Sequence, residues 1–182
     1  YPGDYLNVQC ETAVHSVRTN LLIANSSILN IGGSYTNANS GNTFDNITTG
    51  IYTYKTTSRI RNNSLTNTVD AILIRDFASG SYISRNTTQT NTPRAIKAIN
   101  TVQNGSGIKL SISNNTLTDP TYGIRLINVV AASSGTNKVT IDNNTITLNG
   151  TATTRYGIWC ENSNYTEVYC NNISRTTLQA SN

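Results

Sequence analysis

Residues 112–117 read Ile112-Ser113-Asn114-Asn115-Thr116-Leu117, an Asn pair between aliphatic residues. Similar stretches stand at 60–65, 83–88, 141–146 and 168–173, with a partial copy at 42–44. One Asn therefore recurs along the chain, in the set Asn42, Asn63, Asn86, Asn115, Asn144 and Asn171. The intervals between these residues are 21, 23, 29, 29 and 27 residues. A repeat of this length predicts a solenoid in which each repeat forms one coil.

A second signature, a small residue followed by Ile, comes after each of the first five Asn residues. The pairs are Gly50-Ile51, Ala71-Ile72, Ala95-Ile96, Gly123-Ile124 and Gly157-Ile158. Each repeat then holds three short strands: one from this pair, one ending near the Ile before the Asn, and one just after the Asn. Stacked at about 4.8 Å per coil, such strands form parallel sheets around an Ile and Leu core. We expect the recurring Asn to occupy a left-handed bend and to bond to its copies as an Asn ladder.

This pattern resembles the right-handed parallel β-helix of pectate-lyase-like proteins. Its Asn-Asn-Thr-Ile motif is similar to that of large secreted bacterial surface proteins. The resemblance covers residues 39–182 and implies an all-β solenoid of about six to seven coils. Residues 1–38 match less well, and we expect an N-terminal segment or a degenerate first coil there, around 17–22. Because neither end shows a capping helix, we expect a piece of a longer chain, or end-to-end packing on another subunit.

The composition excludes several classes of protein. The 182 residues include 27 Asn, 29 Thr and 18 Ser, only 12% are charged, and the net charge is +4. Disordered chains have high net charge or many prolines, and this chain has neither. No apolar run approaches the ~18 residues of a membrane span. Arg and Lys occur singly, so we expect no nucleic-acid partner.

The first strand of each repeat supplies the candidate binding residues. Two positions after its small residue lie Tyr52, Leu73, Lys97, Arg125 and Trp159, and Glu161 follows in the last repeat. In catalytic members of the resembled family, substrate lies along this first sheet between flanking loops. The resemblance thus implies a cationic and aromatic surface for a sugar chain, with Tyr52, Lys97, Arg125, Trp159 and Glu161 as candidate contacts.

Catalytic signals are sparse. A glycosidase needs two carboxylates at a definite separation, and no two acids face one another in the expected first-strand positions. The single His15 lies outside the clear repeats, which leaves nucleophilic chemistry without support. The clustered acids that a calcium-dependent lyase needs are missing as well. We therefore expect no catalytic residue, metal or cofactor in this segment.

The cysteines and the threonines leave alternatives open. Cys160 and Cys170 could bridge across one coil, which suits an oxidising location, or could pack as small apolar residues. Three cysteines, including Cys10, without paired spacing argue against zinc. Thr116-x-Thr118 and Thr145-x-Thr147 stack in register, and a flat Thr array can bind ice.

The function expected from the sequence is a non-catalytic, extracellular or cell-surface structural and adhesive module. Its expected partners are glycans or neighbouring surface proteins, with a filament component as a further form. The leading alternative is a carbohydrate-active lyase or glycosidase, or a tailspike-like depolymerase, whose acids lie outside this segment. An ice-binding module is the minor alternative.

Overall fold

The computed structural model describes residues 5–8, 14–15, 21–24, 28–33, 41–89, 91–100, 108–131, 138–149 and 154–176. Within these residues the chain forms twenty β-strands and no helix. Every third strand joins the same sheet, so the strands build three parallel sheets, named A, B and C. No helix in the described part of the chain is long and apolar enough to cross a membrane.

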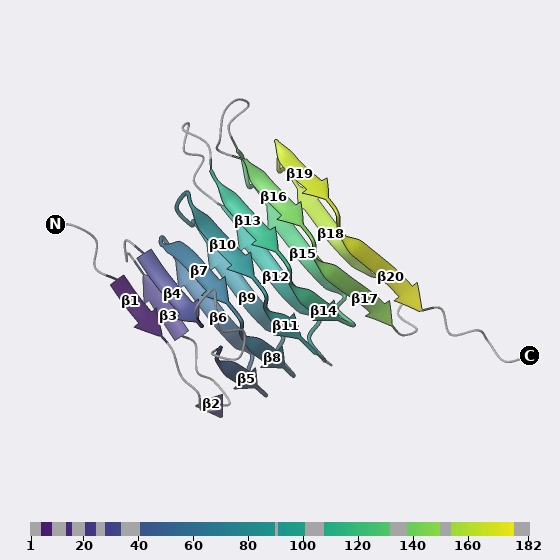
Figure 1. Cartoon of the computed structure of the whole chain (residues 1–182), viewed down its shortest axis with the longest axis horizontal. Helices are drawn as coiled ribbons and strands as arrows, with labels where there is room; N and C mark the ends of the chain where they lie inside the picture. The colour runs from purple at the N-terminus through teal and green to yellow at the C-terminus, as the bar shows by residue number, and fades with distance from the viewer. Residues whose placement is uncertain are drawn as a thin grey trace, which may run out of the picture.

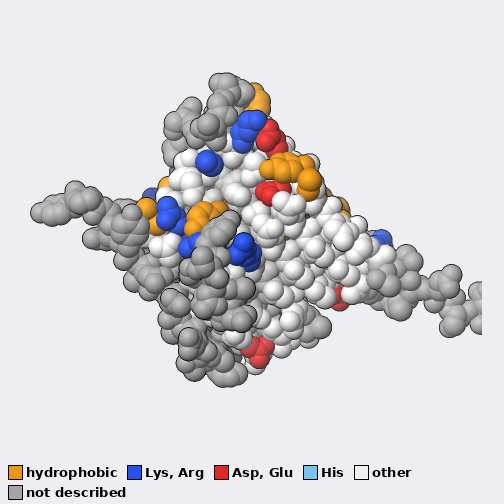
Figure 2. Space-filling view, viewed as in Figure 1, with side chains coloured by type: hydrophobic (Ala, Val, Ile, Leu, Met, Phe, Trp, Pro, Cys, Tyr) orange, Lys and Arg blue, Asp and Glu red, His pale blue; other side chains and the backbone are white. Residues whose placement is uncertain are grey.

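Sheet A holds seven strands, and the last five of them end just before a recurring Asn. They are β1 (Tyr5–Val8), β4 (Ile28–Gly32), β7 (Thr57–Arg61), β10 (Ser81–Ser84), β13 (Leu110–Ser113), β16 (Val139–Asp142) and β19 (Thr166–Tyr169). Their outer face lies toward the viewer in Figure 1. In Figure 2 this face is mostly white, and most of its basic side chains gather on the left and toward the top.

Sheet B holds seven short strands, and all but the first follow a recurring Asn. They are β2 (Val14–His15), β5 (Thr43–Asp45), β8 (Ser64–Thr66), β11 (Thr87–Thr88), β14 (Thr116–Thr118), β17 (Thr145–Asn149) and β20 (Asn172–Thr176). Sheet C holds six strands, and all but the first contain the small residue followed by Ile. They are β3 (Leu21–Ala24), β6 (Thr49–Tyr54), β9 (Asp70–Arg75), β12 (Arg94–Ile99), β15 (Tyr122–Ile127) and β18 (Tyr156–Glu161).

The chain winds as a right-handed parallel β-helix. It descends through sheet A at the front, crosses sheet B at the bottom and returns through sheet C behind, while it advances from left to right (Figure 1). Sheets A and B each have seven strands, so the prediction of six to seven coils is confirmed. The right-handed crossover is the arrangement that the twist of β-strands favours.

The core is a stack of aliphatic side chains in register. In sheet C the inward positions are held by Ile51, Ile72, Ile96 and Ile124, each at most 1% exposed. In sheet A they are held by Ile60, Ile83, Ile112 and Ile141, all fully buried. Burying one such side chain stabilises the fold by about 1.5–3 kcal/mol. The regular spacing of Ile in the sequence therefore becomes the stabilising column of the fold.

The small residue before each of these Ile residues fits a narrow corner between sheets B and C. A Cβ atom added to Gly123 would lie 2.5 Å from the carbonyl oxygen of Gly157 and 3.0 Å from Cγ2 of Ile146. Ala71 and Ala95 hold the equivalent position in other coils and are fully buried. The corner therefore admits no side chain larger than Ala.

The predicted Asn ladder is confirmed. The Nδ2 atom of each Asn donates to Oδ1 of the next one, at 2.9–3.1 Å, from Asn42 through to Asn171. Nδ2 of Asn115 also donates to the carbonyl oxygens of Ile83 and Ser113, at 3.0 and 3.1 Å. The first five ladder residues are at most 2% exposed. Each buried amide is thus paired along the stack, as buried polar groups require.

The expectation that the ladder Asn itself takes the left-handed bend is wrong. That conformation falls on the residue just before it, with φ between 53° and 57° at Asn62, Arg85, Asn114, Asn143 and Cys170. The ladder amide has to point along the stack to reach its copies, so the preceding residue turns the chain. Asn at this position tolerates positive φ, which explains the Asn pair in three of the five coils.

Residues 1–38 contribute strands to all three sheets. β1 pairs with β4 in sheet A, β2 with β5 in sheet B, and β3 with β6 in sheet C. Of the expected degenerate coil at 17–22, residues 17–20 lie outside the described residues, and β3 begins at Leu21.

Candidate ligand-binding face

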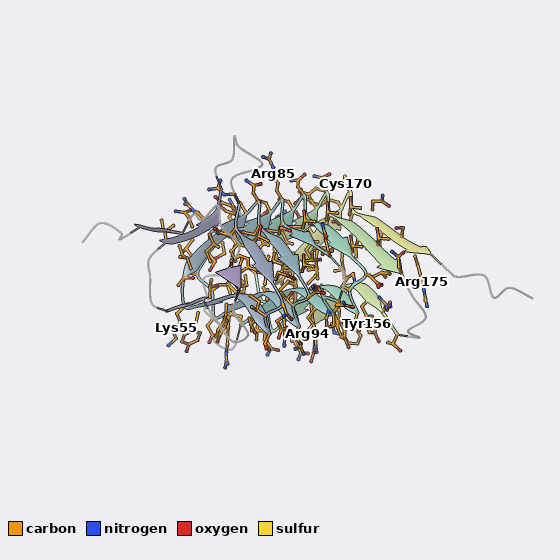
Figure 3. The ribbon with its side chains drawn as sticks, turned by 90° about the horizontal axis from the view of Figure 1, so that it is seen from below. Lys55, Arg85, Arg94, Tyr156, Cys170 and Arg175 are labelled. Atoms are coloured by element: carbon orange, nitrogen blue, oxygen red, sulfur yellow. The ribbon has the colours of Figure 1, made fainter. Side chains whose placement is uncertain are left out.

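The outer surface of sheet C, called the sheet C face, carries the predicted binding residues. Parallel pairing places Tyr52, Leu73, Lys97, Arg125 and Trp159 in one row across five strands. A second row joins Tyr54, Arg75, Ile99, Ile127 and Glu161. A third row, which the sequence analysis did not single out, joins Thr49, Asp70, Arg94, Tyr122 and Tyr156. Among the labelled side chains of Figure 3, Arg94 and Tyr156 extend from this face.

Three aromatic rings cluster on β15 and β18. The rings of Tyr122 and Tyr156 stack, with centroids 5.3 Å apart and planes 14° apart. Trp159 meets Tyr156 edge to face at 4.2 Å and Tyr122 at 6.1 Å. Such pairs contribute about 0.5–1.5 kcal/mol each beyond their buried area, so the cluster is held in shape before any ligand arrives.

Arg125 lies between this aromatic cluster and an acid. Its guanidinium is 5.2 Å from the ring centroid of Tyr122, and its Nη2 lies 2.9 Å from Oε2 of Glu161. Both side chains of the ion pair are partly exposed, at 26% and 40%. The structure therefore brings three of the predicted residues together: Arg125, Trp159 and Glu161.

The other two predicted residues lie farther along the row. Lys97 is the neighbour of Arg125 in the row, and among the described residues no carboxylate pairs with it. Tyr52 lies beyond Leu73, about 14 Å from Arg125 at three strand spacings of about 4.8 Å. Tyr52 is thus outside the reach of the aromatic cluster.

The carboxylates of the sheet C face are engaged by arginines. Oδ1 of Asp70 lies 2.6 Å from Nε of Arg94, and Glu161 pairs with Arg125. These two acids stand three strands apart and five residues apart along the strand direction, which is roughly 22 Å at about 4.8 Å per strand and about 3.3 Å per residue. A glycosidase pair needs a separation of about 5–10 Å. Among the described residues, no three His, Cys, Asp or Glu side chains gather as a potential metal site.

Of the two alternatives left open for Cys160 and Cys170, the structure shows no bridge: both thiols are free and exposed. Cys160 is in register with the buried Leu126, so it occupies an inward position of the last described coil. Cys170 occupies the left-handed bend and projects outward in Figure 3. Partial burial raises the pKa of the Cys160 thiol. Cys10 lies outside the described residues.

The threonines of sheet B stack as the sequence analysis expected. Thr116 pairs with Thr145, and Thr118 pairs with Thr147. Thr87 extends the first row, but the second row carries Gln89 in that coil and Asp45 at β5. The Thr array therefore covers two coils fully and is interrupted beyond them.

Sequence reasoning missed Tyr122 and Tyr156 because it searched positions after the small residue of each repeat. The signal was present: an aromatic residue stands directly before the Gly of two consecutive repeats, in Tyr122-Gly123 and Tyr156-Gly157. In β15 the residue before the buried Gly123 is partly exposed, so Tyr122 lies on the outer side of the sheet.

No family model, curated protein or solved structure matches the chain. The assignment as a parallel β-helix therefore rests on the three sheets, their registers and the Asn ladder.

Proposed function

We propose that this chain is a non-catalytic structural and adhesive β-helix module of the cell surface or extracellular space, which binds glycans through its sheet C face. The observation that supports this proposal is the cluster of Tyr122, Tyr156 and Trp159, bordered by Arg125. We further infer a relation to the pectate-lyase-like superfamily, on the resemblance of the repeat pattern.

The chemistry of the cluster suits a sugar ring. The face of an aromatic ring carries negative charge density, and the C–H groups on one side of a pyranose are weakly positive, so the two surfaces attract. Tyr and Trp also offer a polar tip beside their apolar body, which can bond to sugar hydroxyls. The rings stand on paired strands of a stiff stack, so little ordering is needed when a ligand binds.

Adhesion without turnover agrees with the placement of the acids. Asp70 and Glu161 are each paired with an arginine and stand roughly 22 Å apart on the sheet C face, too far to act together on one glycosidic bond. A carbohydrate-active enzyme remains the competing function, with its acids outside the described residues.

A glycan array on the purified chain, followed by product analysis of every hit, tests the proposal. We expect binding with no new reducing ends and no unsaturated products. Trp159→Ala and the triple Lys97, Arg125 and Trp159 alanine variant should lose this binding, whereas Tyr169→Ala, an exposed tyrosine of sheet A, should retain it. Turnover of a bound glycan, or unchanged binding by the triple variant, would refute the proposal.

The Thr array is the basis of the ice-binding alternative. A measurement of thermal hysteresis on the same sample separates the two functions, because binding to ice depresses the freezing point without changing the melting point. We expect no hysteresis, since Gln89 and Asp45 interrupt the second Thr row.

A further inference from the structure

The outer surface of sheet A, called the sheet A face, contains a hollow that the preceding proposal does not use. Its volume is about 280 Å³, and it is lined by Tyr82, Ser84, Ser111 and Ser113. This volume is near the lower end of ligand pockets and has room for about one sugar ring. The hollow lies on β10 and β13, on a different sheet from the aromatic cluster of the sheet C face.

The hollow follows from a step in side-chain size between neighbouring coils. Tyr82 is in register with Ser111, and Ser84 with Ser113. A large ring on β10 therefore stands beside two small side chains on β13, and the difference leaves open space against the ring. Because parallel pairing fixes the register, the wall and the floor of the hollow are built into the sheet.

The opposite neighbour of Tyr82 is cationic. Arg59 is in register with Tyr82, with its guanidinium carbon 5.8 Å from the ring centroid, and that of Arg61 lies at 5.2 Å. Arg61 is in register with Ser84, so it stands beside the floor of the hollow. Two guanidinium groups thus border one tyrosine ring, a contact that attracts each cation to the ring face.

The charge of Arg59 is not neutralised. Among the described residues no carboxylate pairs with it, whereas Arg94, Arg125 and Arg155 each pair with an acid. The outward side chains of β7, β10 and β13 include no acid; the next one along the row is Asp142, in register with Ser113. One oxygen of Asp142 accepts a hydrogen bond from the side chain of Asn143.

A buried polar group also faces the hollow. Ser84 is 5% exposed, and its Oγ has no hydrogen-bond partner among the described residues. A buried hydroxyl without a partner is unfavourable, and a ligand that supplies an acceptor or donor would satisfy it. The hollow thus has an aromatic wall and an unused hydroxyl, and an unpaired cation stands beyond that wall, on the β7 side of Tyr82.

We propose that this hollow binds an acidic sugar, that is, a pyranose carrying a carboxylate or a sulfate. The ring of the sugar lies in the hollow against Tyr82, and the anion extends past the edge of that ring to pair with Arg59 on the neighbouring strand β7. Guanidinium groups suit this role because they form paired hydrogen bonds with planar anions. This site is independent of the glycan site proposed on the sheet C face.

Calorimetric titration of the full chain with trigalacturonate, its methyl ester and a κ-carrageenan tetrasaccharide tests the proposal. The methyl ester keeps the sugar rings and removes the charge, and the carrageenan carries sulfate without carboxylate. We expect trigalacturonate, the sulfated tetrasaccharide or both to bind. If the site recognises the carboxylate, the methyl ester should bind about tenfold more weakly than trigalacturonate. The proposal would be overturned if neither trigalacturonate nor the sulfated tetrasaccharide bound. It would also be overturned if trigalacturonate and its ester bound equally and the sulfated tetrasaccharide did not bind.

Variants locate the binding. Arg59→Gln should weaken binding of the acid about tenfold, and Ser111→Tyr, which fills the hollow, should abolish it. Lys138→Gln removes a cation that pairs with Glu167 on the same side of the molecule and should leave binding unchanged. Trp159→Ala separates this proposal from the previous one, because it disturbs only the sheet C face. The hollow is not the site if Arg59→Gln keeps the wild-type unfolding temperature and still binds the acidic oligosaccharide with wild-type affinity. The same conclusion follows if Trp159→Ala no longer binds the acidic oligosaccharide.

Discussion

The sheet C face and the sheet A face carry arginines in opposite chemical settings. On the sheet C face, Arg94 and Arg125 each pair with an acid, and the aromatic rings pack mainly on one another. On the sheet A face, Arg59 contacts a tyrosine ring and pairs with no carboxylate among the described residues. One scaffold therefore presents an aromatic surface whose arginines are paired with acids and a hollow beside an unpaired arginine, and we expect the two surfaces to select different sugars.

The largest effect should come from breaking the scaffold that both faces share. Asn115→Ala removes donors to Asn144, Ile83 and Ser113 and leaves buried partners unsatisfied. We expect a loss of about 3–5 kcal/mol in the free energy of unfolding, measured by urea denaturation. Asn114→Gly is the matched control, since Gly keeps the left-handed bend at φ 57° and should change stability little. If the two variants were equally stable, the ladder would not be a main source of stability.

A smaller effect, confined to one face, should come from the corner behind sheet C. In Gly123→Ala the new Cβ meets the carbonyl oxygen of Gly157, so β18 has to shift together with Trp159. We expect a loss of about 1–3 kcal/mol and weaker glycan binding on the sheet C face, with acid binding on the sheet A face retained. Equal loss of binding on both faces would show that the faces are mechanically coupled.

Added salt should weaken ligand binding on the sheet A face by a few-fold more than ligand binding on the sheet C face. Raising sodium chloride from 0.1 to 0.5 M shortens the screening length from about 10 Å to about 4 Å. Binding of an acidic sugar at Arg59 should weaken several-fold in calorimetric titration. Binding of a neutral glycan at Tyr156 and Trp159 should stay constant, and a strong salt dependence there would contradict binding through the aromatic rings.

The smallest effect concerns the two thiols of the last described coil. Burial raises the pKa of Cys160, so at pH 8 less of it is thiolate than of a freely exposed thiol. We expect iodoacetamide to modify Cys170 faster than Cys160, as followed by peptide mass spectrometry. Faster modification of Cys160 than of Cys170 would contradict the inward position of the Cys160 side chain. Ser at either position serves as the control for peptide assignment.

Much of the fold could be predicted from the sequence because the repeat constrains it strongly. The ladder positions and the inward Ile of each strand follow from fixed offsets, and the structure confirms them through Asn115 and Ile124. The row from Tyr52 to Trp159 also follows, since parallel pairing keeps equivalent residues side by side.

The clusters could not be predicted from offsets alone. Whether Arg125 turns to Glu161 or to Tyr122 depends on side-chain geometry across strands, and the structure shows both contacts. The hollow at Tyr82 depends on the size of its neighbour in the next coil, 29 residues away in sequence. The left-handed bend at Cys170 was not predicted either. The ladder imposes a positive φ at this position, a conformation that Cys rarely adopts.

The emission of Trp159, the single tryptophan of the chain, tests the separation of the two faces most directly. Its ring lies in the aromatic cluster of the sheet C face, so only a ligand on that face should change its fluorescence. We predict that a neutral glycan found on the array shifts this emission, and that trigalacturonate binds without shifting it. An unchanged emission with the neutral glycan bound, or a shift caused by the acid, would contradict the assignment of one ligand class to each face.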